Sequence, residues 1–115
     1  MEALFTADDL IHAYTRAQAL EDGVLVDVTA AADAVGVRVH TAMTAGLFAD
    51  VGGEDKARLL RAFGDVRAAL LAAPADEDRV YFTLRGVGGD VDAWAHIGPG
   101  DDGEPVLTLM RQGED

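Results

Sequence analysis

The chain has 115 residues, half of them hydrophobic, and it carries 21 acidic against 9 basic side chains, a formal net charge of −12 at pH 7. This length and apolar content predict one folded domain over residues 1–115 and argue against a disordered tail. The absence of cysteine excludes disulfides, zinc–thiolate sites, iron–sulfur clusters and thiol nucleophiles. Direct nucleic-acid binding is not expected, because phosphate contacts need clustered Lys and Arg, and here the basic residues are scattered.

Two features bear on where the protein resides. No apolar run approaches the roughly 20 residues that a membrane-spanning helix needs. The first residues of the chain carry acids where a secretory signal needs basic side chains. We therefore expect a cytoplasmic protein that does not bind membranes.

The N-terminal region is expected to be helical. Residues Thr6–Tyr14 are predicted as a helix, with a strand over Leu10–Tyr14 as the alternative. Thr15 and Gln18 have the spacing of a capping box, in which each side chain accepts a backbone N–H at a helix start. Gly23 is suited to end that helix in the left-handed conformation.

The apolar run Val24–Val28 is β-prone and is a candidate extra strand. Asp27 interrupts this run. Buried, its carboxylate would need a partner such as Arg16; exposed or capping, it needs none, and we favour the exposed or capping role.

The middle of the chain is predicted to hold three further helices. A short one begins at Thr29, which can cap it, and ends near Gly36; Val37–Val39 is at most a bridge or a small strand. The next has Thr41 as its cap and carries Met43, Leu47 and Val51 four residues apart. The longest spans about 55–73, because its apolar residues repeat with helical spacing. They are Leu59, Phe63, Val66 and Leu70.

In the last third the apolar period changes from 3.6 to 2, which predicts strands at about 79–86, 91–98 and 105–111. Gly88–Gly89 is the signal of a two-residue hairpin turn. That turn would pair Arg85 with Asp92 and Thr83 with Trp94. The second hairpin is expected to place Ile97 opposite Leu107. The fold class is therefore α+β: a three- to four-stranded antiparallel sheet, with Val24–Val28 as the optional strand at one edge of the meander, packed on three to four helices.

One face of the predicted meander gathers polar and aromatic side chains away from the helices, which is typical of an interaction surface. The alternative is that the N-terminal segment or a second subunit covers this face, so a homodimer is compatible with the sequence. The six residues that we take as the candidate interaction surface are Tyr81, Arg85, Asp92, Trp94, His96 and Met110.

Catalytic and metal signals are weak. Serine is absent, so Ser-His-Asp catalysis is excluded. His12, His40 and His96 lie in different elements without metal-ligand spacing, and we expect neither a metal nor a cofactor. The Gly86–Gly89 segment joins two strands and does not open a helix, which argues against phosphate binding. Gly98–Pro105 is interpreted as a turn, because it lacks the carboxylate spacing of a calcium loop.

Two stretches, YTRAQALEDGVLVDVT near the front and IGPGDDGEPVLTLM near the end, are similar to a small uncharacterised bacterial family encoded on plasmids, phages and other mobile elements. The middle of the chain is similar in pattern only: members tend to have an aromatic-Arg-aromatic-Pro run and a Trp, where this chain has Val37–His40 and Phe48. The similarity does not extend over roughly residues 52 to 80. It implies a mobile-element accessory role and no catalytic residue.

These observations favour a small, acidic, non-catalytic module that binds a protein partner. One alternative is an acidic mimic of nucleic acid that inhibits a host DNA-binding or defence protein. Another is a small-molecule binder or enzyme that uses Asp27, His96, Tyr81 and Arg85 on the outer sheet face.

Overall fold

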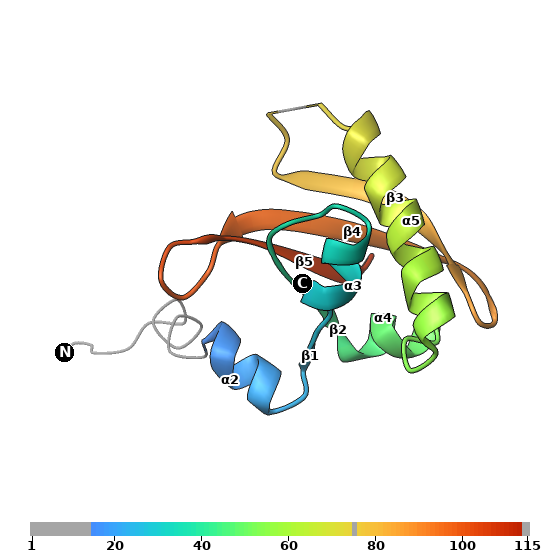
Figure 1. Ribbon diagram of the computed structural model, residues 1–115, viewed down its shortest axis with the longest axis horizontal. Coiled ribbons are helices and arrows are strands. Elements are labelled where there is room, and N and C mark those ends of the chain that lie inside the picture. The colour runs from blue at the N-terminus through green and yellow to red at the C-terminus, as the bar shows by residue number, and fades with distance from the viewer. Residues whose placement is uncertain (1–14, 75, 114–115) are drawn as a thin grey trace.

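The computed structural model describes residues 15–74 and 76–113. These residues form an α+β fold with one five-stranded mixed sheet and four helices (Figure 1). In chain order the elements are α2 (Arg16–Glu21), β1 (Leu25–Asp27), α3 (Thr29–Ala34), β2 (His40–Thr44), α4 (Ala45–Asp50), α5 (Lys56–Ala72), β3 (Arg79–Gly86), β4 (Gly89–Pro99) and β5 (Pro105–Arg111). The predicted helix over Thr6–Tyr14 and the residue His12 lie outside the described residues.

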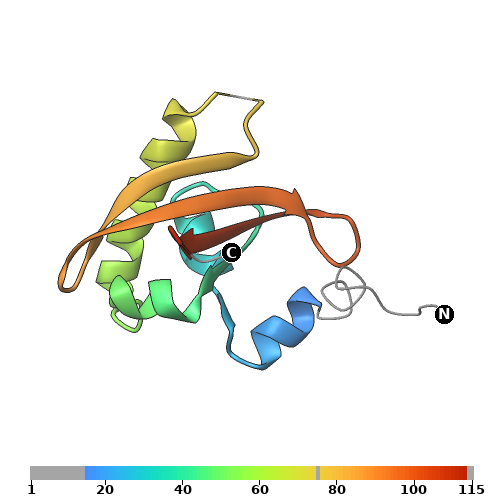
Figure 2. The ribbon, with the colours of Figure 1, turned by 180° about the vertical axis from the view of Figure 1, so that it is seen from behind.

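The strands lie in the order β1-β2-β5-β4-β3, and α5 and α3 cover one face of the sheet (Figures 1 and 2). The C-terminal meander is present as predicted, but β2 pairs parallel with β5 and β1 pairs antiparallel with β2. The predicted α+β class is therefore confirmed, whereas the sheet is five-stranded and mixed in place of the predicted three- to four-stranded antiparallel sheet. The segment around Val24–Val28 does join the sheet, but through β2 and not at an edge of the meander.

Strand β2 is the element that sequence reasoning missed. The predicted helix with Thr41 as its cap begins instead at Ala45, and Thr44 is the N-cap, accepting the backbone N–H of Leu47 at 3.3 Å. Thr41, Ala42 and Met43 are all buried because β2 lies inside the sheet with both faces covered. A strand buried on both faces lacks the alternation of apolar and polar residues that identifies half-exposed strands in a sequence.

The local signals predicted around the N-terminal helix are confirmed by the structure. Thr15 and Gln18 form the reciprocal capping box of α2, and Gly23 has a φ of 80°. The long helix α5 begins after Asp55, whose carboxylate accepts two backbone N–H groups, and ends one residue before the predicted position. Thr29, predicted as the cap of α3, is instead the first helical residue.

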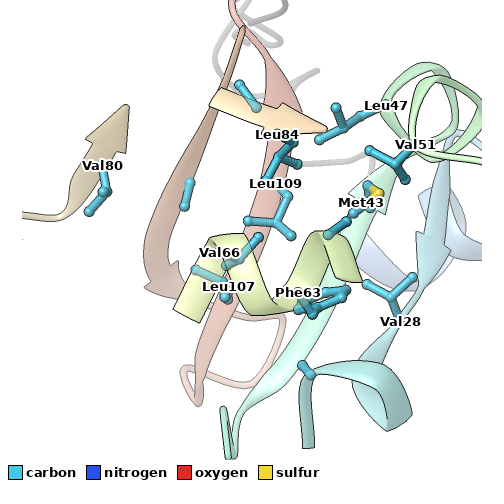
Figure 3. Packing of buried hydrophobic residues seen from close by; sticks show 14 residues of the cluster. Val28, Met43, Leu47, Val51, Phe63, Val66, Val80, Leu84, Leu107 and Leu109 are labelled. Carbon is cyan, nitrogen blue, oxygen red and sulfur yellow. The ribbon is translucent and has the colours of Figure 1, made fainter. Parts of the chain in front are cut away.

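The core lies between α5 and the covered face of the sheet (Figure 3). Phe63 and Val66 of α5 are fully buried and pack with Met43, Leu107 and Leu109 from the central strands. Burying each of these side chains stabilises the fold by about 1.5–3 kcal/mol. The apolar stripe predicted for the long helix is therefore the face that packs on the sheet.

The β3–β4 hairpin has a different register from the predicted one. Its turn is at Val87–Gly88, and Gly86 pairs with Gly89, so every β3 residue faces a β4 residue two positions earlier than expected. The predicted two-residue turn over Gly88–Gly89 is wrong, because Gly89 is already the first residue of β4. Gly89 has a positive φ of 123° at that position. A shift of two residues preserves the faces of the strand. Val80, Phe82 and Leu84 therefore still point toward the core as predicted.

The β4–β5 register is the predicted one: Ile97 pairs with Leu107 and Trp94 with Met110. Ala93 and Ala95 of β4 and Leu107 and Leu109 of β5 face the core, and any odd shift would turn them outward. Ile97 was expected to lie inside, but it is 41% exposed at the far end of the pairing. The alternation of apolar residues in β4 and β5 was therefore enough to predict their register without knowledge of the connecting turn.

Candidate interaction surface

The face of β3 and β4 that points away from α5 carries three rings and one guanidinium group in contact. We call this group the aromatic cluster; its members are Arg79, Tyr81, Trp94 and His96. Tyr81 and Trp94 are directly opposed in the sheet, and their rings stack with centroids 6.0 Å apart and an interplanar angle of 20°. His96 meets the Trp94 ring edge-on at 6.2 Å. The Arg79 guanidinium carbon lies 5.2 Å from the centroid of Trp94. Aromatic pairs contribute about 0.5–1.5 kcal/mol beyond their buried area, so these contacts favour the observed positions of the rings.

The exposures within the aromatic cluster differ sharply. Trp94 is only 7% exposed, whereas Tyr81 is 60% exposed. Trp94 is therefore the buried ring against which Tyr81 packs, and Tyr81 is the ring accessible to a partner. An exposed aromatic side chain such as Tyr81, packed against a buried ring, is typical of a residue that anchors a protein interface.

Arg79 was not among the predicted surface residues. It is the first residue of β3 and shares the face of Tyr81 because it lies two residues before it. The same alternation that placed Tyr81 on this face could have identified Arg79. A cation within about 6 Å of a Trp ring adds an attraction of about 0.5–2 kcal/mol.

Arg85 does not join the aromatic cluster and does not pair with Asp92 as predicted. Its guanidinium donates to both carboxylate oxygens of Asp65 on α5, at 2.8 and 3.0 Å, and this bond raises the pKa of Arg85. Asp92 instead accepts the Thr83 hydroxyl at 3.1 Å. The two-residue shift in register places Asp92 opposite Thr83 and Asp90 opposite Arg85. The bond to Asp65 arises separately, because Arg85 lies on the edge strand next to α5.

On the other side of the aromatic cluster, Met110 pairs with Trp94 across β4 and β5 and is partly buried. The next position of β5 on that face is Thr108, whose hydroxyl accepts Arg16 Nη1 at 2.6 Å. Arg16 also donates to the carbonyl of Leu107 at 3.0 Å, and burial lowers the pKa of its guanidinium. The Arg16 side chain thus connects helix α2 to the outer side of the sheet.

Asp27 is exposed and its carboxylate accepts both the backbone N–H and the hydroxyl of Thr29, at 2.9 and 2.6 Å. These hydrogen bonds lower the pKa of Asp27, with smaller contributions from His40 and Arg16. The carboxylate therefore satisfies a backbone donor at the start of α3. This is a structural use of Asp27 at a helix start.

The four residues of the enzyme alternative are not brought together. Asp27, Ala42, Thr108 and His96 are successive neighbours across β1, β2, β5 and β4, so Asp27 and His96 are separated by three strand spacings. That is about 14 Å at the usual interstrand distance. Arg16 binds Thr108 in the space between them.

An open groove of about 810 Å³ lies between the start of α3, the start of β2 and the β4–β5 turn, lined by Asp27, Thr29, Ala30, Asp33, Val37, Arg38, Val39, His40, Glu104 and Pro105. Its charged groups already have local partners: Asp27 bonds to Thr29, and Arg38 lies 3.9 Å from Asp33. In the described ranges no three His, Asp or Glu side chains come close enough to hold a metal ion. No helix in that part of the chain is long and apolar enough to cross a membrane.

Comparison of the chain with protein-family models, with curated proteins and with solved structures found no match.

Proposed function

We propose that the protein is a small non-catalytic module that binds a protein partner through the aromatic cluster. The observation that supports this most directly is the pairing of an exposed Tyr81 with a buried, stacked Trp94. A ring held in this way loses little conformational entropy when a partner covers it, so most of its contact energy is available for binding.

The chemistry of the aromatic cluster defines the kind of partner. Tyr, Trp and Arg are the residue types that dominate binding energy at protein interfaces. Arg79 supplies the positive charge beside the rings, while Asp92 lies further along the same face. A protein surface that presents an apolar or aromatic side chain with a carboxylate next to it would complement the cluster. The similarity to a mobile-element family makes a host protein the partner that we expect.

The nucleic-acid mimic has less support from the arrangement of the acids. Mimicry needs carboxylates free to stand in for regularly spaced phosphates, and several acids here have local roles. They cap helices or bond to neighbouring side chains: Asp27, Asp50, Asp55, Asp65, Asp92 and Asp101. The enzyme alternative has none of its residues gathered in one pocket. The protein-binding module is therefore the better proposal.

A matched pair of surface variants tests the proposal. Wild type, Tyr81→Ala and Val87→Ala are immobilised, and the proteins each retains from a lysate of the encoding organism are quantified by mass spectrometry. Val87 is the control, because it is 54% exposed, close to Tyr81 in exposure, and lies on the hairpin turn. We expect Tyr81→Ala to weaken capture of a specific partner by about 30-fold, as for an interface hot spot, with Val87→Ala close to wild type.

Thermal melts by circular dichroism establish that both variants are folded. The proposal is overturned if wild type retains no specific protein, if Tyr81→Ala retains the same proteins as wild type, or if both variants lose them equally.

A further inference from the structure

The strands at the two edges of the sheet differ in length. β1 at one edge is three residues long, whereas β3 at the other edge is eight residues long. Natural proteins protect long edge strands with Lys, Pro, bulges or covering segments, because unpaired backbone groups attract other strands. β3 contains neither Lys nor Pro, and its two charged side chains are engaged within the fold, Arg79 over the Trp94 ring and Arg85 with Asp65.

The backbone groups that point outward from β3 can be identified from its two ends. The Asp78 carbonyl, just before the strand, accepts Ile97 N–H at 2.9 Å and so points toward β4. The Arg85 N–H points the other way, to Asp65 at 3.5 Å. Backbone direction alternates along a strand, so Arg79, Tyr81 and Thr83 also direct their N–H and C=O groups outward. Within the part of the chain that the structure describes, no protein group bonds to them from that side.

A groove of about 620 Å³ runs beside this open stretch, between the end of α5 and the start of β3. Ala69 and Ala72 of α5 and Ala73, which follows the helix, form one wall, and Val80 and Tyr81 form part of the other. A strand added to the β3 edge would point every second side chain into this groove. Leu71, on the same last turn of α5, is 68% exposed.

We propose that a second copy of this chain pairs with β3 along this edge, antiparallel and related by a two-fold axis at Tyr81. Tyr81 then lies opposite the partner's Tyr81, and Arg79 opposite the partner's Thr83. This gives about six new backbone hydrogen bonds and one continuous sheet across both protomers. The inference goes beyond partner binding and does not depend on it, because it rests on backbone groups and not on the face of the aromatic cluster.

The register follows from which positions are open. Centring the axis on Tyr81 uses only Arg79, Tyr81 and Thr83, whose outward backbone groups bond to no other described residue. Centring it on Phe82 places Arg79 against the partner's Arg85, a like-charge contact that destabilises a strand pair. Centring it on Thr83 requires the Arg85 N–H, which Asp65 already accepts.

The pairing also accounts for the apolar groove. Val80 and Phe82 point toward α5, and in this register Val80 lies beside the partner's Phe82. The partner's ring therefore enters the groove lined by the alanines of α5. On the opposite face the two Tyr81 rings become neighbours, which joins the two aromatic clusters into one surface.

Sedimentation equilibrium of the full chain tests the assembly. We expect a dimer of twice 12.1 kDa. Thr83→Pro should weaken self-association by about 30-fold or more, because proline removes an outward N–H on each protomer. Proline is tolerated at such edge positions, so the fold should persist. Thr83→Ala is the matched control, since it also loses the hydroxyl bond to Asp92 but keeps the N–H.

Single cysteines test the register, because the chain has none of its own. Tyr81→Cys should form an intermolecular disulfide on mild oxidation, since directly opposed residues are about 5.5 Å apart at Cα. Thr83→Cys should not, because the two copies of that residue lie four positions apart in the pairing. A monomeric wild type, an unaffected Thr83→Pro dimer, or cross-linking of Thr83→Cys in place of Tyr81→Cys would each overturn the proposal. If the Thr83→Pro variant is monomeric and still captures a partner protein, dimer formation and the proposed partner binding are independent of each other.

Discussion

At the scale of single residues, Arg16 and Asp101 hold the N-terminal helix to the rest of the fold. Asp101, in the β4–β5 turn, accepts the first two backbone N–H groups of α2 at 2.9 and 3.0 Å. Arg16 in return reaches across to β5. An acid at a helix N-terminus also interacts favourably with the helix dipole. This reciprocal contact spans 85 residues of sequence between Arg16 and Asp101, so no local pattern predicts it.

Asp27 gives the protein a pH-dependent contribution to stability. Its hydrogen bonds from Thr29 lower its pKa, so the contribution is present above the unfolded-state pKa, near 3.9. It is lost as the pH falls through the lower folded-state pKa. We expect Asp27→Ala to reduce the free energy of unfolding by about 1 kcal/mol at pH 7, as for a lost helix cap. The deficit should shrink below about pH 3 as the wild-type carboxylate is protonated.

Urea denaturation at both pH values measures this effect. Asp102→Ala is a suitable control, because Asp102 is an exposed acid in the β4–β5 turn. A deficit for Asp27→Ala that is equal at both pH values would contradict an ionised, hydrogen-bonded carboxylate.

At the scale of elements, α5 carries a local defect on its exposed side. Gly64 lies in the interior of the helix, is exposed, and an added Cβ would meet no atom within 4 Å. Glycine in a helix interior costs about 0.5–1 kcal/mol relative to alanine. Gly64→Ala should therefore raise the free energy of unfolding by about that amount, seen as a higher urea midpoint. Ala68→Gly, one turn further along the exposed side, should lower it by a similar amount; a destabilised Gly64→Ala would show that something packs on this side of α5.

At the scale of the whole molecule, the charges are segregated along the chain. Residues 56–85, which hold α5 and β3, contain six of the nine basic side chains and only four of the 21 acids. The remaining residues are strongly acidic. The proposed dimer edge therefore lies in the part of the chain where self-repulsion is weakest.

The acidic remainder predicts a salt effect. Repulsion between like charges destabilises a compact state and is screened by salt. Raising NaCl from about 10 to about 300 mM at pH 7 should increase the melting temperature by a few degrees, since the Debye length falls well below the molecular dimensions. Near the pI of about 4.3 the same salt change should have little effect. A melting temperature that falls with salt at pH 7 would mean that attractive ion pairs outweigh the repulsion.

Local patterns in the sequence were enough to predict the capped helix α2, the long helix α5 and the core-facing residues of most of the C-terminal strands. Each depends on residues within a few positions of one another, and the core-facing set of a strand survives an even shift in register. The same patterns placed Tyr81 and Trp94 on one face, although not directly opposite each other. They did not show that one would be buried and the other exposed.

The motif Tyr14–Thr29 by itself determined a capped helix, a glycine stop and a short β-prone run. Only the tertiary structure decided where that run would pair, because its neighbour β2 is a strand solely through contacts with β1 and β5. The turn of the β3–β4 hairpin was also decided by context, since Val87 N–H bonds to the Asp50 carbonyl at 2.8 Å. Local propensities are set by neighbours in sequence, whereas strand order and register are set by burial against distant segments, and those contacts left the edge of β3 open.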